Sequence, residues 1–419
     1  MANAGIVAEY NPFHTGHAYQ IAQTRGALGE DAAVTAVMSG NWVQQAGCAV
    51  ADKWVRAEMA LRGGVDLVLE LPTVWATASA EAFARGAAAI LEGSGVVDAI
   101  SFGSECGQAD PLAQVAACLD TPACRWELAR CLGEGRSFPA ARQEAVRVLL
   151  GEEAAGLLST PNNNLGVEYI RALRALSSEI RPMTVRREGA PHGSLTAGEG
   201  MPFRSATQLR ACLEREEWAE ARPFIPDGCR KVLATAWDGA PSLSRLERAM
   251  LARVRTMGEG DWAALPDSGA AEGLPRRLVR AGREARSMEE FYALAKTRRY
   301  THARLRRLAR WAFLGVRRED VPPSPPYLRV LGFNRRGQGL LREMRERARL
   351  PILTKPAHAR RLDWSGRRLF ELEARCTDLY DLCRKTIPAP GREWVTGPVR
   401  LEENQIQATG AEHEVYPEL

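Results

Sequence analysis

The chain has 419 residues, of which 45% are hydrophobic and 26% charged, and its 56 basic against 51 acidic residues leave a net charge of +5. This length exceeds one compact core, so two domains are expected, and the small net charge excludes a polycation. Nine cysteines occur without a Cys-x-x-Cys pair, which argues against a zinc ribbon or a dithiol redox site. No apolar run reaches the ~18–20 residues that cross a bilayer, so we expect a cytoplasmic protein with reduced thiols and no membrane partner.

The first 215 residues alternate short apolar runs with helical patterns. Strands are expected over residues 4–9, 33–38, 65–71, 96–102 and 183–186, and helices over residues 16–28, 53–63, 80–91, 166–176 and 207–215. Strands that alternate with helices predict right-handed crossovers and a parallel sheet. Because the strands are nearly continuous apolar runs, both faces of this sheet are expected to be covered. The predicted fold class of residues 1–215 is therefore α/β, as a Rossmann-like domain.

The pattern changes after residue 216, where strand signals nearly vanish. Helices are expected over residues 243–257, 274–286, 288–314 and 338–348. We therefore predict a boundary near residue 216 and a second, mainly α-helical domain over residues 216–419. Within this domain, the Pro- and Gly-rich stretch 386–398 predicts a loop before a loosely ordered tail.

A His-x-Gly-His turn, residues 14–17, joins the first predicted strand to the first helix. In a doubly wound sheet, ligands bind at the carboxyl ends of the strands and phosphates bind at helix N-termini. Gly16 lets a nucleotide approach the backbone, and His14 and His17 share one face of the first helical turn. Their imidazoles can donate hydrogen bonds to an α-phosphate in its transition state, so both are predicted to be catalytic. The alternatives are a surface turn whose histidines cap the helix, and a metal site, although no Cys or Glu stands nearby at ligand spacing.

A second motif, Ser205-Ala206-Thr207-Gln208-Leu209-Arg210, opens the last helix of the first domain. Hydroxyls and free N–H groups there suit β- and γ-phosphates, and Arg210 is placed to neutralise leaving pyrophosphate. We therefore predict a phosphate-binding role for Ser205, Thr207 and Arg210, with an ordinary helix cap as the alternative. The chain has no Walker-type loop and no Gly-x-Gly-x-x-Gly after its first strand. Its two motifs resemble instead those of nucleotidyltransferases, which attack an α-phosphate and release pyrophosphate.

A basic helical stretch marks the second domain, with 14 Lys or Arg and 3 Asp or Glu between Pro275 and Arg318. Arg299, Arg306 and Arg310 fall near one helical face. Such a face can follow a phosphate backbone, and an interleaved aromatic ring can stack on an unpaired base. The residues expected to bind RNA are Lys296, Arg298, Arg299, Tyr300, Arg306 and Arg310. The alternative is a solvated helix face in an Arg-rich protein.

Further stretches, taken in order, carry a more specific resemblance. They are residues 5–17, Asp52-Lys53-Trp54, residues 64–72, Ser101-Phe102-Gly103-Ser104-Glu105, Pro161-Asn162-Asn163-Asn164-Leu165-Gly166, Arg187 before Gly189-Ala190, Thr297-Arg298-Arg299-Tyr300-Thr301 and residues 327–334. With this order and spacing, the chain resembles the bacterial tRNA(Met) cytidine acetate ligases along nearly its whole length. The resemblance implies that acetate and ATP give acetyl-adenylate and pyrophosphate. The acetyl group then passes to the exocyclic amine of the wobble cytidine in elongator tRNA(Met), giving N(4)-acetylcytidine.

The resemblance also implies an ATP-binding segment, which continues from the first strand into the first helix. Its residues are Val7, Ala8, Glu9, Tyr10, Asn11, Pro12, Phe13, His14, Thr15, Gly16, His17, Ala18, Tyr19 and Gln20. Gly103, Asn162 and Arg187 complete the implied nucleotide site. These three suit their roles, because a glycine at a strand end admits a base or ribose, an asparagine donates and accepts, and an arginine meets phosphate. The alternatives are a turn glycine, a turn asparagine and a surface arginine.

One stretch departs from the family, since Gln44 is followed by Gln45-Ala46-Gly47-Cys48 where members usually carry Arg-Gly-Glu-Pro. Carboxylates for a dedicated metal cage are not evident, so Mg²⁺ is expected to arrive with ATP. The expected partners are acetate, ATP and elongator tRNA(Met), with no obligate protein partner. Two other functions remain open: an adenylyltransferase acting on a small metabolite, and a non-enzymatic RNA-binding protein.

Overall fold

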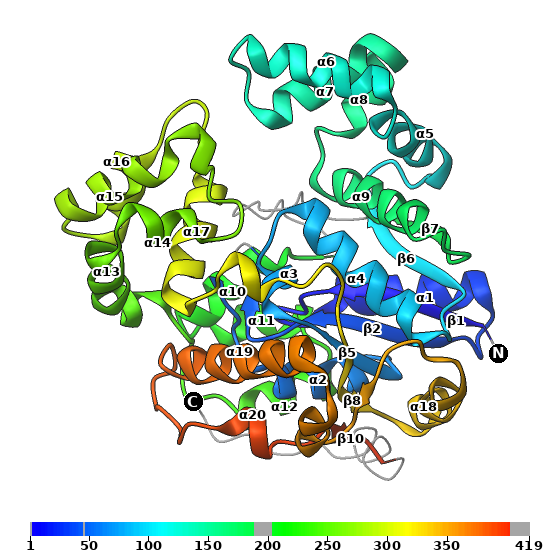
Figure 1. Ribbon diagram of the computed structural model, residues 1–419. Helices are drawn as coiled ribbons and strands as arrows, with labels where there is room; N and C mark the ends of the chain where they lie inside the picture. Colours follow the sequence, from blue (N-terminus) through cyan, green and yellow to red (C-terminus); the bar gives the residue numbers. More distant parts are fainter. Residues whose placement is uncertain (1, 45–46, 188–202, 403–419) are drawn as a thin grey trace.

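The computed structural model describes residues 2–44, 47–187 and 203–402. Within them a twisted sheet runs through the centre of the molecule (Figure 1), in the order β10-β8-β5-β2-β1-β6-β7, with β9 beside β8. Its strands are β1 (Asn3–Ala8), β2 (Ala33–Ser39), β5 (Leu67–Leu71), β6 (Ala99–Ser104), β7 (Arg181–Arg186), β8 (Leu328–Phe333), β9 (Ile352–Leu353) and β10 (Val399–Arg400). A separate hairpin joins β3 (Trp42–Val43) to β4 (Gly47–Cys48). The predicted α/β class is confirmed.

The five strands expected in the first domain all form, and they pair in parallel. Ile6 lies beside Ala36 of β2 on one side and Ser101 of β6 on the other. Every residue of β2 and β5 is buried, as their continuous apolar sequence predicts for strands covered on both faces. The carboxyl ends of β1, β6 and β7 therefore meet at one edge of the sheet.

Three strands of this sheet, β8, β9 and β10, come from beyond residue 216. β8 pairs antiparallel with β5, and β10 pairs in parallel with β8. The second part of the chain is mainly helical, as expected, but it also completes the sheet of the first part. The division at residue 216 stays a prediction.

Helices cover both faces of the sheet, and alternate residues of β2 pack against opposite faces. Val34, Ala36 and Met38 pack toward one face with α2, α10 and α12, while Val37 packs toward the other with α4 and α9. The helices of this layer are α1 (Thr15–Leu28), α2 (Lys53–Arg62), α3 (Thr73–Ala76), α4 (Ala80–Ser94), α9 (Pro161–Ala175), α10 (Ala206–Glu214), α11 (Trp218–Ala221), α12 (Asp227–Thr235) and α18 (Arg335–Arg347).

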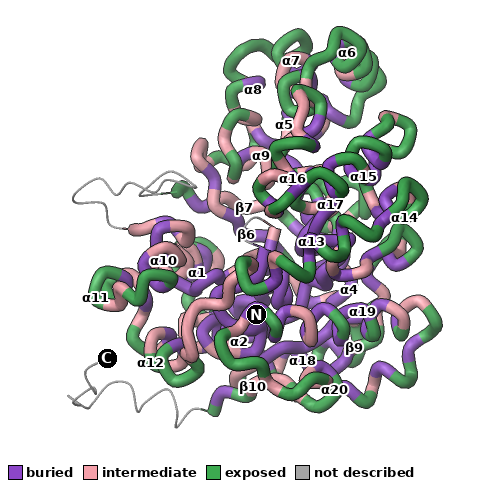
Figure 2. The backbone as a smooth tube through the Cα atoms, turned by 90° about the vertical axis from the view of Figure 1, so that its left-hand side faces the viewer, coloured by how far each residue is buried: buried purple, intermediate pink, exposed green. Residues whose placement is uncertain are grey.

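Two helical lobes stand out from this layer (Figure 1) and are green, hence exposed, along their outer sides in Figure 2. The first lobe lies between β6 and α9 and was not predicted: α5 (Ala109–Leu119), α6 (Pro122–Gly133), α7 (Phe138–Leu150) and α8 (Glu152–Leu157). The second holds the basic stretch: α13 (Glu247–Thr256), α14 (Glu259–Ala263), α15 (Leu274–Glu284), α16 (Met288–Ala295) and α17 (His302–Leu314).

The single helix expected over residues 288–314 is wrong, because a turn separates α16 from α17. The hydroxyl of Thr297 accepts hydrogen bonds from the N–H groups of Arg299 and Tyr300, and Thr301 caps α17. Hydroxyl side chains that bond the local backbone compete with helix formation in this way.

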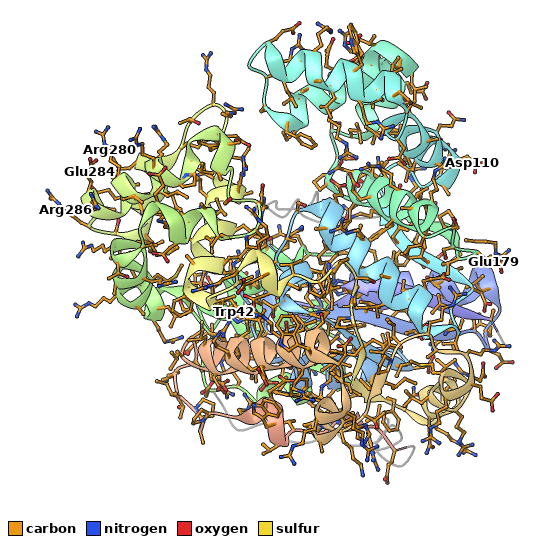
Figure 3. The ribbon with its side chains drawn as sticks, in the orientation of Figure 1. Trp42, Asp110, Glu179, Arg280, Glu284 and Arg286 are labelled. Atoms are coloured by element: carbon orange, nitrogen blue, oxygen red, sulfur yellow. The ribbon has the colours of Figure 1, made fainter. Side chains whose placement is uncertain are left out.

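Two later helices, α19 (Trp364–Asp381) and α20 (Arg392–Val395), return to the first half of the chain. Figure 3 shows Trp42 between α17 and α19, where its ring packs near Phe313 and Tyr380. Its indole N–H donates to the carbonyl of Cys376 over 2.8 Å. In the described part of the chain, no helix is long and apolar enough to cross a membrane.

Candidate functional site: a cavity at the carboxyl edge of the sheet

A cavity of about 400 Å³ opens where β1, β6 and β7 end. Four helices begin at its wall, with Gly16, Ala80, Pro161 and Ala206 in their first turns. Helix N-termini present unpaired N–H groups and the positive end of the helix dipole, so this arrangement favours a polyanion. Sixteen of the predicted site residues line it: Val7, Ala8, Glu9, Tyr10, Asn11, His14, Gly16, His17, Tyr19, Gln20, Gly103, Asn162, Arg187, Ser205, Thr207 and Arg210.

Four residues of the implied ATP segment do not line this cavity: Pro12, Phe13, Thr15 and Ala18. The Phe13 ring is fully buried against the helices on the other side of the turn, and Gly63 is the residue that makes room for it. Phe13 therefore supports the loop from behind.

His14 and His17 pack against each other, with ring centroids 3.8 Å apart. His14 is the N-cap of α1, and its Nδ1 accepts the N–H of Gly16 over 3.1 Å. The Nδ1 of His17 reaches back and accepts the N–H of His14 over 3.2 Å. Both histidines thus cap the helix, as one of the alternatives expected, and both still line the cavity.

This capping fixes which nitrogen carries the proton. A neutral imidazole has one acceptor and one donor, so an accepting Nδ1 leaves the proton on Nε2. Burial, together with the positive charges of Arg187 and Arg210, lowers the pKa of His14 to about 3. Burial also lowers the pKa of His17 well below its usual range, with contributions from His14 and Arg187. Near neutral pH the pair therefore offers two uncharged Nε2–H donors.

Gly103, Asn162 and Arg187 come together on the β6–β7 side of the cavity. The Nη1 of Arg187 donates to Asn162 Oδ1 over 3.3 Å, and Asn162 Nδ2 donates to the carboxylate of Glu105 over 2.6 Å. A Cβ at Gly103 would lie 3.2 Å from the Arg187 side chain. The glycine therefore lets the arginine lie across the strand end, where a phosphate or ribose can be met.

The start of α10 forms the opposite wall. Ser205 caps this helix by accepting the N–H of Gln208, and the Gln208 side chain accepts the N–H of Ser205 in return. Arg210 donates to the carbonyl of Asn11 over 2.9 Å and to the hydroxyl of Thr207 over 3.0 Å. The guanidinium thus ties α10 to the loop before His14, beside the cavity.

The basic residues of the second lobe do not share the one helical face that the sequence predicts. Arg298, Arg299 and Arg306 are exposed, but Arg298 and Arg299 lie in the turn before α17 and not on a helix. Lys296 Nζ donates to the carbonyl of Tyr300 over 3.1 Å. Figure 3 shows Arg280, Glu284 and Arg286 on the outer edge of the same lobe.

For two residues of this set, Tyr300 and Arg310, burial contradicts the prediction that they bind RNA. The Tyr300 ring is 6% exposed and its hydroxyl donates to the carbonyl of Glu272 over 2.7 Å, so it packs inside the lobe. Arg310 is 5% exposed and donates to the carbonyls of Val43 and Gln44. It faces the first half of the chain in place of the solvent, because α17 turns this side toward the β3–β4 hairpin.

Several lining residues were missed by sequence reasoning. They are Gln44, Ala80, Phe83, Phe102, Asn164, Leu165, Tyr169, Arg186, Phe203 and Arg204. Arg186, Phe203 and Arg204 adjoin predicted residues in sequence, which is a usable signal. Phe83 and Tyr169 read as ordinary core positions of helices, and only the fold brings them to the cavity. Gln45, Ala46, Gly189 and Ala190 lie outside the described residues.

One group of potential metal ligands occurs among the described residues, at Cys212, Glu217 and Glu220. It lies at α10 and α11, outside the cavity, and Arg204 donates to both Cys212 Sγ and the Glu220 carboxylate. An arginine between these groups already supplies their positive charge. The cavity itself is lined by one carboxylate residue, Glu9, among the residues that the structure describes.

Comparison with known proteins gives consistent matches over most of the chain. Residues 1–392 match the model of the family described as HIGH Nucleotidyl Transferase. A tRNA(Met) cytidine acetate ligase of Thermoanaerobacter sp. (strain X514) is 35% identical over 96% of this chain and 100% of the relative. One of the same name from Caldanaerobacter subterraneus is 37% identical over 92% of this chain and 96% of the relative.

Solved structures agree with these relatives. The crystal structure of Thermotoga maritima TmcAL without ligand has a TM-score of 0.89 at 33% identity, covering 96% of this chain and 100% of that one. A second crystal form of that protein, bound with alpha-thio ATP, has a TM-score of 0.87 at 33% identity, over the same shares of both chains.

Proposed function

We propose the function of this chain from one premise: the chain belongs to the family of tRNA(Met) cytidine acetate ligases, within the HIGH nucleotidyltransferases. It is an ATP-dependent ligase that joins acetate to the wobble cytidine of elongator tRNA(Met), through acetyl-adenylate. The observation that carries this function is the His14/His17 pair, whose two Nε2–H groups are held for donation at the edge of a cavity made for a polyanion.

In the first step a carboxylate oxygen of acetate attacks the α-phosphorus of ATP, and the bond to the β,γ-pyrophosphate breaks. The α-phosphate gains negative charge on its equatorial oxygens as five bonds form. Uncharged imidazole donors that are already oriented stabilise this charge without reorganisation, which is the main source of catalysis in such a site.

The remaining groups are assigned to parts of ATP by their positions. The nucleoside is assigned to the β6–β7 side, with Gly103, Asn162 and Arg187. The triphosphate is assigned to the first turns of α1 and α10, where Arg210 would neutralise the leaving pyrophosphate. Mg²⁺ would be held chiefly by the phosphates, since hard cations bound with ATP keep several waters and need few carboxylates.

In the second step the exocyclic amine of the cytidine attacks the acetyl carbon, and AMP leaves. A tRNA presents this base in its anticodon loop, where it is unpaired and can be held without melting a helix. Lys296, Arg298, Arg299 and Arg306 are proposed to contact the RNA backbone. The supporting observation is the exposure of these three arginines on a lobe whose α17 also contacts Gln44 at the cavity wall.

The test is incubation of the purified chain with ATP, labelled acetate and total tRNA. Acid-stable label in tRNA, with AMP and pyrophosphate released, supports the ligase. Label or AMP transferred to a small molecule would support a metabolic adenylyltransferase, and RNA binding without pyrophosphate release would support a non-enzymatic protein. Activity of the purified chain alone would also support the absence of an obligate protein partner, and a tRNA substrate supports a place in the cytoplasm.

A further inference from the structure

The second step releases a proton that the histidine pair is not arranged to take. The cytidine amine loses this proton as its nitrogen bonds to the acetyl carbon. The Nδ1 atoms of His14 and His17 already accept backbone N–H groups, and their Nε2 atoms carry protons. An imidazole in this state donates toward the cavity and has no lone pair to offer there.

Among the described residues that line the cavity, Glu9 is the only Asp or Glu. The other titratable side chains of the wall are those histidines together with tyrosines and arginines, residue types whose ordinary pKa values lie well above neutral pH. Glu9 directly follows β1, two residues ahead of Asn11, whose carbonyl is held by Arg210. The carboxylate therefore belongs to the same loop as the histidine pair.

The position of Glu9 is fixed from both its main chain and its side chain. Arg56 donates to the carbonyl of Glu9 over 2.5 Å, and Arg56 itself is fully buried. The N–H of Gln44 donates to Glu9 Oε1 over 2.8 Å. Gln44 is held in turn by two hydrogen bonds. Its side-chain amide donates to the carbonyl of Ala78, and its main-chain carbonyl accepts a hydrogen bond from Arg310. A carboxylate held this way is ready to accept a proton at its second oxygen.

We propose that Glu9 is the general base of the acetyl-transfer step, an inference that rests on the proposed function. The amine nitrogen of the cytidine forms its bond to the acetyl carbon, and its proton passes to the Glu9 carboxylate. The bond between that carbon and the phosphate oxygen breaks, and AMP leaves with the electron pair. Glu9 returns the proton to solvent after AMP departs. The adenylation step needs no such base, because acetate attacks as an anion.

Neighbouring residues of one loop thus act in different steps of the reaction. The histidines stabilise charge on the phosphate in the first step, and Glu9 removes the proton in the second. Arg56, Arg210 and Arg310 all lie close enough to interact electrostatically with Glu9, so its negative charge is compensated while acetate, another anion, enters the same cavity.

The test is the Glu9→Gln variant, which keeps an acceptor for the Gln44 N–H and removes the base. The transfer step is measured alone, in single turnover, from synthetic acetyl-adenylate to elongator tRNA(Met). The first step is measured as acetate-dependent ATP–pyrophosphate exchange without tRNA. We expect transfer to fall by about 10²–10⁴-fold and by far more than exchange, which can lose some activity because Glu9 also lines the ATP cavity, while tRNA binding is retained. Glu9→Asp withdraws the carboxylate by one methylene, and its transfer rate is expected to lie between those of the wild type and Glu9→Gln.

Glu58→Gln, on α2 and outside the cavity, is the matched control and should leave all three measurements unchanged. Wild-type transfer by Glu9→Gln would overturn the proposal and assign the proton to the leaving phosphate or to water. A loss of exchange as large as the loss of transfer, in a variant that binds tRNA normally, would also overturn it by placing Glu9 in adenylation. Failure of the wild-type chain to acetylate tRNA would instead contradict the proposed function itself.

Discussion

The ammonium group of Lys53, on α2, lies 2.6 Å from the carboxylate of Glu393, on α20, and neither side chain is more than 1% exposed. The same ammonium lies 2.7 Å from Glu70 at the end of β5. A buried charge is tolerated only when it is paired, so the two halves of the chain depend on each other here. This contact accompanies the sheet pairing of β5 with β8.

Replacing Lys53 with Met should lower the free energy of unfolding by about 3–5 kcal/mol, because it leaves buried carboxylates without their partner. Denaturant unfolding followed by circular dichroism measures this change. Arg349→Met is the control, since it removes an ion pair with Glu92 whose arginine is 73% exposed, and such a pair contributes about 0–1 kcal/mol. An equal loss in both variants would contradict the special role of the buried contact.

Glu373 adds a pH dependence to the same region. Burial, and next the nearby charge of Glu70, raise the pKa of this carboxyl to about 8 from a usual value of 4.5. A folded-state pKa above the unfolded one means that the folded protein binds the extra proton, so stability is lost as pH rises from about 4.5 through about 8. Glu373→Gln should therefore flatten the fall in denaturant midpoint across this range. A fall as steep as in the wild type would contradict the assignment.

A substitution at His14 can separate its role as the N-cap of α1 from its role as a hydrogen-bond donor to phosphate. His14→Asn keeps a side-chain acceptor for the start of α1, since Asn is a favoured N-cap, but removes the Nε2–H. We expect acetate-dependent pyrophosphate exchange to fall by about 10²-fold with the fold and thermal stability preserved. His358→Asn, outside the cavity, should have no effect on exchange. Wild-type exchange by the double variant of His14 and His17 would remove them from the mechanism.

Charge reversal at Arg298 and Arg299 tests the basic turn before α17. The double variant to Glu should weaken tRNA binding and reduce the slope of log K against log salt by about two, as expected for two lost phosphate contacts. Pyrophosphate exchange without tRNA should persist. Reversal of Arg342 and Arg345, exposed on α18, makes the same change in net charge and should leave binding nearly unchanged. If exchange falls together with binding in a folded variant, the two activities are not divided between the lobe and the cavity.

The parallel core of the fold was predictable from sequence because strands buried on both faces are continuous apolar runs. Strand β8 was not predicted because Arg329 and Gly332 interrupt its apolar pattern, and because its partner β5 lies far away in the chain. Arg329 is 1% exposed and pairs with Glu393, so its burial depends on a tertiary contact that local sequence does not show.

The site was predictable where topology alone places residues, at strand ends and first helical turns. This covers His14, Gly16, His17 and Arg210, whereas Gly103 was implied only by the family resemblance. Spacing failed at Arg310, since helical periodicity groups residues on a face without telling which face another element covers. Gln44 was noted only as a departure from the family, and the structure shows its backbone N–H on Glu9.

The most direct measurement is mass spectrometry of nucleosides from tRNA treated with the purified chain, ATP and acetate. The cytosine amine is delocalised into its ring and needs an activated acyl donor, which acetyl-adenylate supplies. An acetylated cytosine resists mild alkali, whereas an ester at the 3′ end hydrolyses. The account predicts N(4)-acetylcytidine at the wobble position of elongator tRNA(Met), formed only when both ATP and acetate are present. Label that washes off in mild base, with no acetylated nucleoside in the digest, would contradict it.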